Sequence, residues 1–188
     1  MRARFGILIL SWFLLVVNGA TAEPVVPVPG DCRPILWARP MDKTGLPNLY
    51  QVSETLYRGA QPTEEGLKEL QRMGVKTVIN LRSFHSDRDI VPEGLRYVSI
   101  PMKAWHIENE DLSQFLRLVQ DSGQVPVFVH CQHGADRTGV VCAVYRMAIQ
   151  EWTEEEAIKE MTEGGYGFWP RWGNIKQYLR NLDLEELR

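Results

Sequence analysis

The chain has 188 residues and a formal net charge of −3 at pH 7, with 44% hydrophobic and 24% charged residues. A mildly acidic chain has no general attraction for nucleic acid or anionic lipid, so any anion that it binds must be held by a local site. The three cysteines, Cys32, Cys131 and Cys142, are an odd number, and their spacing suits neither a disulfide framework nor a zinc site.

The first 22 residues have the pattern of a secretory signal peptide. Arg2 and Arg4 precede an apolar run over residues 5–17, and Ala20 and Ala22 have the spacing that a signal peptidase recognises. The apolar run is shorter than the roughly 20 residues that a spanning helix needs, so an uncleaved anchor is the weaker interpretation. We therefore expect residues 1–22 to be removed and the protein to be exported, periplasmic or secreted, with no stable membrane span in its mature form.

A leader and one folded domain follow. Residues 23–46 are rich in proline and are typical of an extended tether or a strap across a domain surface. Residues 47–188 have regular patterning and enough length for a single domain with a sizeable core.

Strands and helices alternate through this domain. Residues 49–58 predict a hairpin or a pair of short strands, and Thr63 begins a helix that Gly74 ends. Thr153 and Glu156 match a capping box at the start of another helix. Periodicity and composition predict the remaining elements: strands over 75–81, 95–102 and 125–129, and helices over 111–119, 137–150 and 174–188. This order indicates an α/β domain with a central, mostly parallel sheet flanked by helices.

The most informative segment is the string HCQHGADRTG over residues 130–139. A hydrophobic strand leads to Cys131, five residues intervene, and Arg137 opens a helix. Helix N-terminal amides and an arginine favour the thiolate form of a cysteine, and the same amides form a nest for a tetrahedral anion. Gly134 permits the tight turn, Arg137 offers a planar fork to two oxygens, and Thr138 can donate a hydrogen bond to the sulfur. The segment therefore predicts a phosphate-binding loop that carries a cysteine nucleophile, with Gln132, His133, Gly134, Ala135 and Thr138 as substrate-binding residues.

This string resembles the C-x5-R-[ST] phosphate loop of the protein tyrosine phosphatase superfamily, and it looks closest to the compact dual-specificity and atypical bacterial branch. Residues 48–82 are similar to the opening of that branch, as is Trp152-Thr153 with the acidic helix start that follows. The resemblance implies hydrolysis of phosphomonoesters in two steps, in which Cys131 forms a thiophosphate intermediate that water then hydrolyses. It also implies that His130 orients the loop by hydrogen bonding, and that neither a metal nor another cofactor is needed.

The general acid that protonates the leaving group is harder to place. In the resembled family this acid is commonly an aspartate on the loop after the preceding strand, where this chain has Lys103 or Ala104. Asp136, directly before Arg137, resembles an aspartate of myotubularin-like and Sac-like phosphoinositide phosphatases, and we expect it to be the acid. Four loop residues remain as alternatives: His106, Glu108, Glu110 and Asp111. Glu110 and Asp111 would also suit a helix N-terminus without any role in catalysis.

Two further features stay open. Cys142 lies in an apolar run that indicates a buried helix position, Cys32 lies in the leader, and either could form a protective disulfide with Cys131. An aromatic cluster near the C-terminus indicates packing of the last helix or, as the less favoured interpretation, one wall of a pocket; it comprises Tyr166, Phe168, Trp169 and Trp172, with Arg171.

The sequence thus predicts a phosphatase that acts on phosphotyrosine or another phosphoprotein, or on a phosphoinositide. The alternatives are an inositol phosphate or pyrophosphate phosphatase, a non-catalytic phosphate-binding module, and a sulfur-transfer enzyme of the rhodanese type. An intact Cys131 counts against a binding module, because a binder needs no nucleophile, and Arg137-Thr138 favours phosphate over a persulfide. No nucleic-acid partner is expected, and the sequence indicates no oligomeric state.

Overall fold

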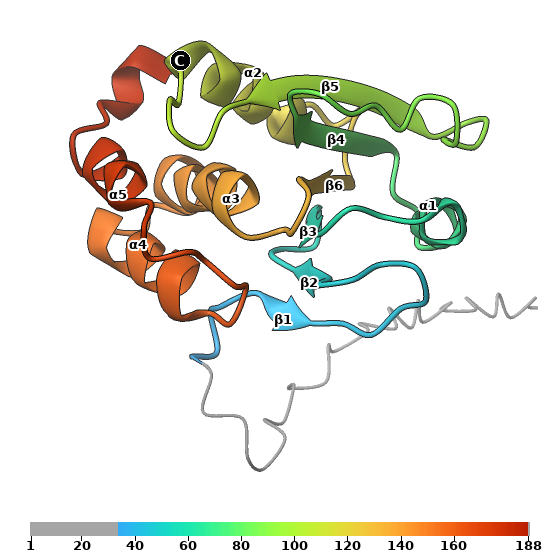
Figure 1. The fold of residues 1–188 in the computed structure, drawn as a ribbon, viewed down its shortest axis with the longest axis horizontal. Coiled ribbons are helices and arrows are strands. Elements are labelled where there is room, and N and C mark those ends of the chain that lie inside the picture. The colour runs from blue at the N-terminus through green and yellow to red at the C-terminus, as the bar shows by residue number, and fades with distance from the viewer. Residues whose placement is uncertain (1–33, 188) are drawn as a thin grey trace, which may run out of the picture. The chain divides into compact units, whose positions relative to one another are not determined.

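The computed structural model describes residues 34–187, so the predictions about the signal peptide, Cys32 and most of the leader lie outside the described residues. These residues form a six-stranded sheet with the order β1-β2-β3-β6-β4-β5 (Figure 1). The strands are β1 (Arg39–Pro40), β2 (Tyr50–Gln51), β3 (Leu56–Gly59), β4 (Thr77–Arg82), β5 (Arg96–Met102) and β6 (Val127–His130). Strands β3, β6, β4 and β5 are parallel, and β2 and β1 continue one edge antiparallel. The expected α/β fold with a mostly parallel sheet is confirmed.

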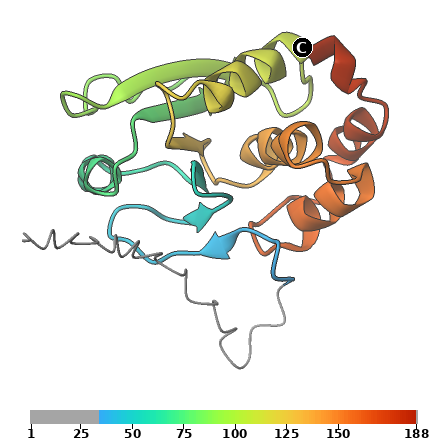
Figure 2. The same ribbon diagram turned by 180° about the vertical axis from the view of Figure 1, so that it is seen from behind.

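The helices cover both faces of the sheet. They are α1 (Glu64–Arg72), α2 (Asn109–Gln120), α3 (Asp136–Ile149), α4 (Glu154–Glu163), α5 (Gly173–Arg180) and a short 3-10 helix, η1 (Leu184–Leu187). Helix α1 lies on one side of the sheet and α2 to α5 lie on the other, as Figure 1 and the reverse view in Figure 2 both show. Strand β6 explains this arrangement, because Val127 and Val129 belong to the core under α2 to α5 whereas Phe128 packs in the core under α1. Burial on both faces accounts for the continuous apolar runs in the sequence.

Two predicted helix starts are confirmed by their caps. The Thr63 side chain accepts a hydrogen bond of 3.1 Å from the Gly66 N–H at the start of α1. Thr153 and Glu156 form the reciprocal capping box at the start of α4. Each cap satisfies amide groups that the first turn of a helix leaves without partners.

The prediction of one helix over 174–188 is wrong. Helix α5 ends at Arg180, and a separate turn of 3-10 helix begins at Leu184. Between them, the Asp183 carboxylate accepts a hydrogen bond of 2.9 Å from the Glu185 N–H. A short polar side chain that bonds to nearby backbone in this way competes with helix continuation, and it starts a new turn instead.

The described part of the leader lies along the edge of the sheet. Strand β1 pairs with β2, and the N–H of Ala38 donates to Oε1 of Glu160 at 2.6 Å. Glu160 is buried and forms an ion pair of 2.7 Å with Arg146. Burial alone would raise the pKa of the Glu160 carboxyl, but its hydrogen bonds and attraction to Arg146 lower that pKa below the ordinary value. An ionised Glu160 therefore ties the leader to α3 and α4.

Within residues 34–187, none of the helices combines the length and apolar character needed to cross a bilayer.

Candidate active site

The loop between β6 and α3 occupies the place that the sequence predicts. Strand β6 ends at His130, α3 begins at Asp136, and residues 131–135 connect them. The loop therefore lies at the carboxyl ends of the parallel strands and at the N-terminus of a 14-residue helix. Open α/β sheets bind ligands at this edge, and a helix N-terminus favours an anion there.

The backbone of the loop is held with its carbonyl groups facing away from its centre. Each of the five carbonyls from Cys131 to Ala135 accepts a hydrogen bond. The Cys131 carbonyl accepts from His130 Nδ1 at 3.3 Å, and the Gln132 carbonyl from the Gln61 N–H at 3.2 Å. The His133 carbonyl accepts from Asn48 Nδ2 at 2.9 Å, and the Gly134 carbonyl from Arg58 Nη2 at 2.8 Å. The Ala135 carbonyl accepts from the Gly139 N–H at 2.7 Å. In a trans peptide the N–H points opposite to the carbonyl, so the amides that follow these carbonyls face inward. The result is a nest for a tetrahedral anion.

Cys131 lies at the base of this nest and is 2% exposed. Burial alone would raise the pKa of its thiol. Hydrogen bonds from the Thr138 hydroxyl and amide, the charge of Arg137 and the His133 amide outweigh burial, and the pKa is lowered. Among the described residues the buried Thr138 hydroxyl makes no competing hydrogen bond, which leaves it available to the sulfur. These contacts stabilise a thiolate, the reactive form of a cysteine.

Gly134 is the residue that the turn requires. Its φ is +70°, and a Cβ atom at this position would lie 2.5 Å from the carbonyl carbon and oxygen of Gly59. The end of β3 therefore supports the loop directly, and a side chain at residue 134 would force the two segments apart.

A pocket of about 410 Å³ opens above the loop. Its walls are Gln132, His133, Asp136 and Arg137 from the loop, Arg82, Ser83 and Phe84 after β4, Met102, Ala104 and Trp105 after β5, and Trp169 and Trp172 before α5. Phe84 is 94% exposed and Trp105 is 64% exposed, so the rim of the pocket is aromatic. Trp169 and Trp172 form one wall of the pocket, so the less favoured interpretation of the C-terminal aromatic cluster holds for these two residues. Tyr166, of the same cluster, is buried beneath the Arg58 guanidinium.

Asp136 is the predicted acid that the structure brings to this pocket. It is half-buried, and its Oδ1 accepts a hydrogen bond of 2.9 Å from the Trp169 N–H. The four alternative acids do not line the pocket. His106 lines a different pocket beside α5, Glu108 lies 3.6 Å from His106, and Glu110 and Asp111 lie in the first turn of α2.

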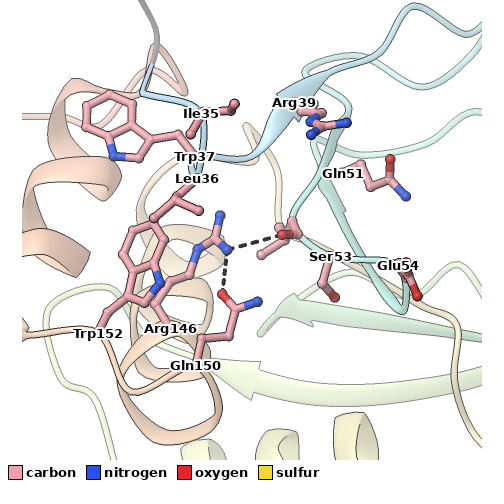
Figure 3. A pocket seen from close by; sticks show the side chains of 11 residues that line it. Ile35, Leu36, Trp37, Arg39, Gln51, Ser53, Glu54, Arg146, Gln150 and Trp152 are labelled. Atoms are coloured by element: carbon pink, nitrogen blue, oxygen red, sulfur yellow. Dashed lines mark hydrogen bonds between the residues drawn. The ribbon is translucent and has the colours of Figure 1, made fainter. Parts of the chain in front are cut away.

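Another pocket, of about 550 Å³, lies near the C-terminal end of α3 (Figure 3). Trp37 and Trp152 lie on one side of it, and the guanidinium of Arg146 hydrogen bonds to Gln150 and to the Val52 carbonyl. Its lining residues include neither a cysteine nor a histidine. It therefore offers no thiol for a cysteinyl intermediate, unlike the loop that carries Cys131.

Cys131 and Cys142 are both free thiols. Cys142 is buried within α3, as predicted, and burial raises the pKa of its thiol to about 11. Such a thiol is a poor partner for thiol exchange with Cys131, because exchange begins from a thiolate. Within residues 34–187 no group of three or more His, Cys, Asp and Glu side chains is arranged to hold a metal ion.

Sequence reasoning missed the residues that hold the loop from outside. Asn48, Arg58 and Gln61 lie in the segment that carries the family resemblance, but no chemistry was assigned to them. A signal did exist for Arg58, since an arginine between Leu56 and Gly59 in a buried strand needs an internal partner. Asp87, which contacts His130 at 3.2 Å, was also missed.

The chain matches known phosphatases over most of its length. The family model described as a DSP-PTPase phosphatase fused to NAD+ kinase matches residues 42–167. The dual specificity protein phosphatase TpbA of Pseudomonas aeruginosa UCBPP-PA14 is 36% identical over 184 residues, which are 96% of this chain and 80% of TpbA. The chain belongs to the dual-specificity phosphatase family. It is accordingly a cysteine-dependent phosphatase.

Solved structures agree with this assignment. A crystal structure of a cysteine-to-serine variant of P. aeruginosa TpbA in complex with phosphotyrosine has a TM-score of 0.72 and 33% identity, covering 83% of this chain and 96% of that chain. The catalytic core of the PP-IP phosphatase Siw14 from S. cerevisiae has a TM-score of 0.67 at 20% identity, covering 76% of this chain and 90% of that chain. The second likeness is one of fold alone.

The contact between Gly134 and Gly59 gives a first prediction. The substitution Gly134→Ala should weaken binding of orthovanadate, a phosphate analogue, by about tenfold or more, because it adds roughly 2 kcal/mol of backbone strain and steric overlap at the nest. Calorimetric titration of the purified protein would measure this affinity. Gly74→Ala is the matched control, since its φ is +81° but nothing lies within 4 Å of the added Cβ. Equal vanadate affinity in both variants would contradict the view that the close contact between Gly134 and Gly59 shapes the anion-binding loop.

Proposed function

We propose that this protein hydrolyses phosphotyrosine in proteins through a cysteinyl-phosphate formed on Cys131. The observation that supports this most strongly is the nest of residues 131–135, whose five carbonyls are all turned outward around a thiol with a lowered pKa. The similarity to TpbA, a variant of which has been crystallised with phosphotyrosine, supports the same substrate class.

In the first step, the Cys131 thiolate attacks phosphorus, an S–P bond forms, and the bond to the leaving oxygen breaks. The electron pair of that bond goes to the oxygen, and Asp136 supplies its proton. In the second step, water attacks phosphorus, the ionised Asp136 takes a proton from the water, and the S–P bond breaks to restore the thiolate. Arg137 stabilises the charge on the phosphoryl oxygens, and the Thr138 hydroxyl donates to the departing sulfur.

The walls of the pocket favour an aryl phosphate over a polyphosphorylated head group. The exposed loop residues Gln132 and His133 carry no permanent charge, and the other arginine of the walls, Arg82, already donates to Gln61. A substrate with several phosphates is better held by several fixed cations. The aromatic rim of Phe84, Trp105 and Trp169 suits the ring of a tyrosine.

Exchange of the nucleophile tests the proposal. Purified protein in reductant and EDTA should release phosphate from a tyrosine-phosphorylated peptide, and Cys131→Ser should lose more than about a thousandfold in kcat. Cys142→Ser is the matched control and should keep most of the activity, because that thiol is buried in α3 away from the pocket lining.

Parallel assays with a phosphothreonine peptide, phosphoinositide vesicles and an inositol pyrophosphate would rank the substrate classes. Faster turnover of either inositol substrate would reject phosphotyrosine as the preferred class. Wild-type protein that binds phosphate but turns over none of these substrates would instead be a binding module.

Two substitutions separate the proton transfer by Asp136 from its bond to Trp169. Asp136→Asn keeps an acceptor for the Trp169 N–H but cannot donate the proton, whereas Asp136→Ala loses both functions. On a phosphotyrosine peptide, Asp136→Asn should lower kcat about a hundredfold, with a smaller loss on para-nitrophenyl phosphate, whose leaving group needs less protonation. If Asp136→Asn matched wild type on both substrates and Asp136→Ala did not, Asp136 would serve only to hold the segment before α5.

We also propose that the protein acts outside the cytoplasm after cleavage of residues 1–22. The signal-peptide pattern of residues 1–22 supports this. Mass spectrometry of the native protein should find an N-terminus at Glu23 in the exported fraction. Ala20→Phe should block cleavage, because the peptidase accepts small residues at this position. A native protein that keeps Met1 and remains in the cell would contradict export.

A further inference from the structure

A buried carboxylate lies behind the phosphate loop and takes no part in the proposed chemistry. Asp87, in the segment after β4, is 1% exposed. Its Oδ2 accepts from Asn80 Nδ2 at 2.9 Å and lies 3.2 Å from Nε2 of His130. Its Oδ1 accepts from the Gln61 side chain and lies 3.1 Å from Nε2 of His85. A buried acid with this many partners is held in one orientation.

The first route from Asp87 to the loop passes through His130, whose ring is fully buried between two acceptors. Nδ1 lies 3.3 Å from the Cys131 carbonyl, and Nε2 lies 3.2 Å from Asp87 Oδ2 without a well-aligned hydrogen bond. A carbonyl oxygen and an ionised carboxylate can only accept protons. The ring can therefore donate to both neighbours only with a proton on each nitrogen.

The surroundings of Asp87 favour its ionised form. Burial alone would raise the pKa of its carboxyl, but the contact with His130, the hydrogen bond from Gln61 and the attraction of His85 outweigh burial and lower the pKa. Tyr97, which accepts from the Asp87 N–H at 3.2 Å, and Asn80 complete its surroundings, and Arg88 lies over the Tyr97 ring. Asp87 is thus an anion among neutral or positively charged groups.

The second route passes through Gln61. Its side-chain N–H donates to Asp87, and its side-chain oxygen accepts from Arg82 at 2.9 Å. Its backbone N–H donates to the Gln132 carbonyl at 3.2 Å. Fixing the side chain at both ends therefore fixes a backbone donor to the phosphate loop.

We propose that Asp87 is a positioning residue that holds His130 as a buried imidazolium and fixes Gln61. Through these two residues it keeps the carbonyls of Cys131 and Gln132 outside the loop, so that the following amides face the sulfur. The imidazolium also places a positive charge one residue from the thiolate. This inference rests on the proposed function in taking Cys131 as the nucleophile.

The Asp87 side chain is not needed to form its own turn. The backbone carbonyl of Asp87 accepts from the N–H groups of Ile90 at 2.9 Å and Val91 at 3.1 Å, and these bonds hold the turn without the carboxylate. The side chain is therefore free to serve the phosphate loop.

Nitrogen-15 NMR of the wild-type protein tests the charge state without any substitution at Asp87. The His130 ring should show two protonated nitrogens at pH 7, with its signals assigned through variants that lack His85, His106 or His133. A ring with one protonated nitrogen at pH 7 would overturn the proposal, and this result does not depend on whether an Asp87 variant folds.

The substitution Asp87→Asn tests the effect on the nucleophile. Iodoacetamide alkylation of Cys131, followed on the Cys131 peptide by mass spectrometry across pH, should show an apparent thiol pKa roughly one unit higher than in wild type, so that the rate falls by about tenfold at pH values below both pKa values. The value of kcat/KM on a phosphotyrosine peptide should fall by about tenfold or more. Asp89→Asn removes the same charge from an exposed neighbour and should change neither quantity.

The outcomes separate the two proposals. A lower melting temperature of Asp87→Asn with an unchanged alkylation profile would leave Asp87 a purely structural role and overturn the inference. A shifted alkylation profile in a protein that has no turnover as wild type would support the inference, while the proposed function would fail.

Discussion

The site depends on five consecutive carbonyl groups that must face away from a bound anion. A peptide whose amide points at a phosphate has its carbonyl on the opposite side, within the protein, where an unpaired carbonyl costs about 1–3 kcal/mol. The loop from Cys131 to Ala135 is therefore possible only because each carbonyl has a donor. Three donors, from Asn48, Arg58 and Gln61, lie in or beside the second and third strands, so the fold around the loop is part of the binding site.

The order of strands in the sheet makes these contacts possible. Strand β6 lies between β3 and β4, so the segments that leave all three strands meet at one edge, where Gln61 and Asp87 reach the loop from opposite neighbours. The contacts also continue away from the site. Arg58 lies 3.6 Å above the Tyr166 ring, and the Tyr166 hydroxyl donates to Glu160 at 3.0 Å. Glu160 also binds Arg146 and the Ala38 N–H of the leader. The loop is therefore connected through Arg58, Tyr166 and Glu160 to α3, α4 and the leader.

The sequence predicts the parts of this site that are close together in the chain. The spacing from Cys131 to Arg137 and the adjacent Asp136 follow from a strand, a turn and a helix start, and each is a local rule. The donors to the loop are not local, since Asn48 and Arg58 lie 85 and 76 residues from the carbonyls that they bind. Their pairing is decided by the packing of strands, which no spacing in one sequence reveals. Asp87 was missed for a different reason, because an aspartate in a polar loop usually indicates only a solvated turn. At the C-terminus, helical periodicity continues through 181–183, but the Asp183 side chain bonds to nearby backbone and the helix ends.

The same arrangement explains how an acidic protein can bind a dianion. Exposed acids more than about 8–10 Å from the site are screened at physiological salt, whereas buried groups are screened much less. Near the thiolate, the Thr138 hydroxyl and amide, the Arg137 charge and the His133 amide outweigh the effect of burial and lower the pKa of Cys131. The acids of the site are both engaged, because Asp136 accepts from the Trp169 N–H and Asp87 is paired with His130. Net charge therefore has little influence on affinity here, and the orientation of a few buried dipoles and cations has much more.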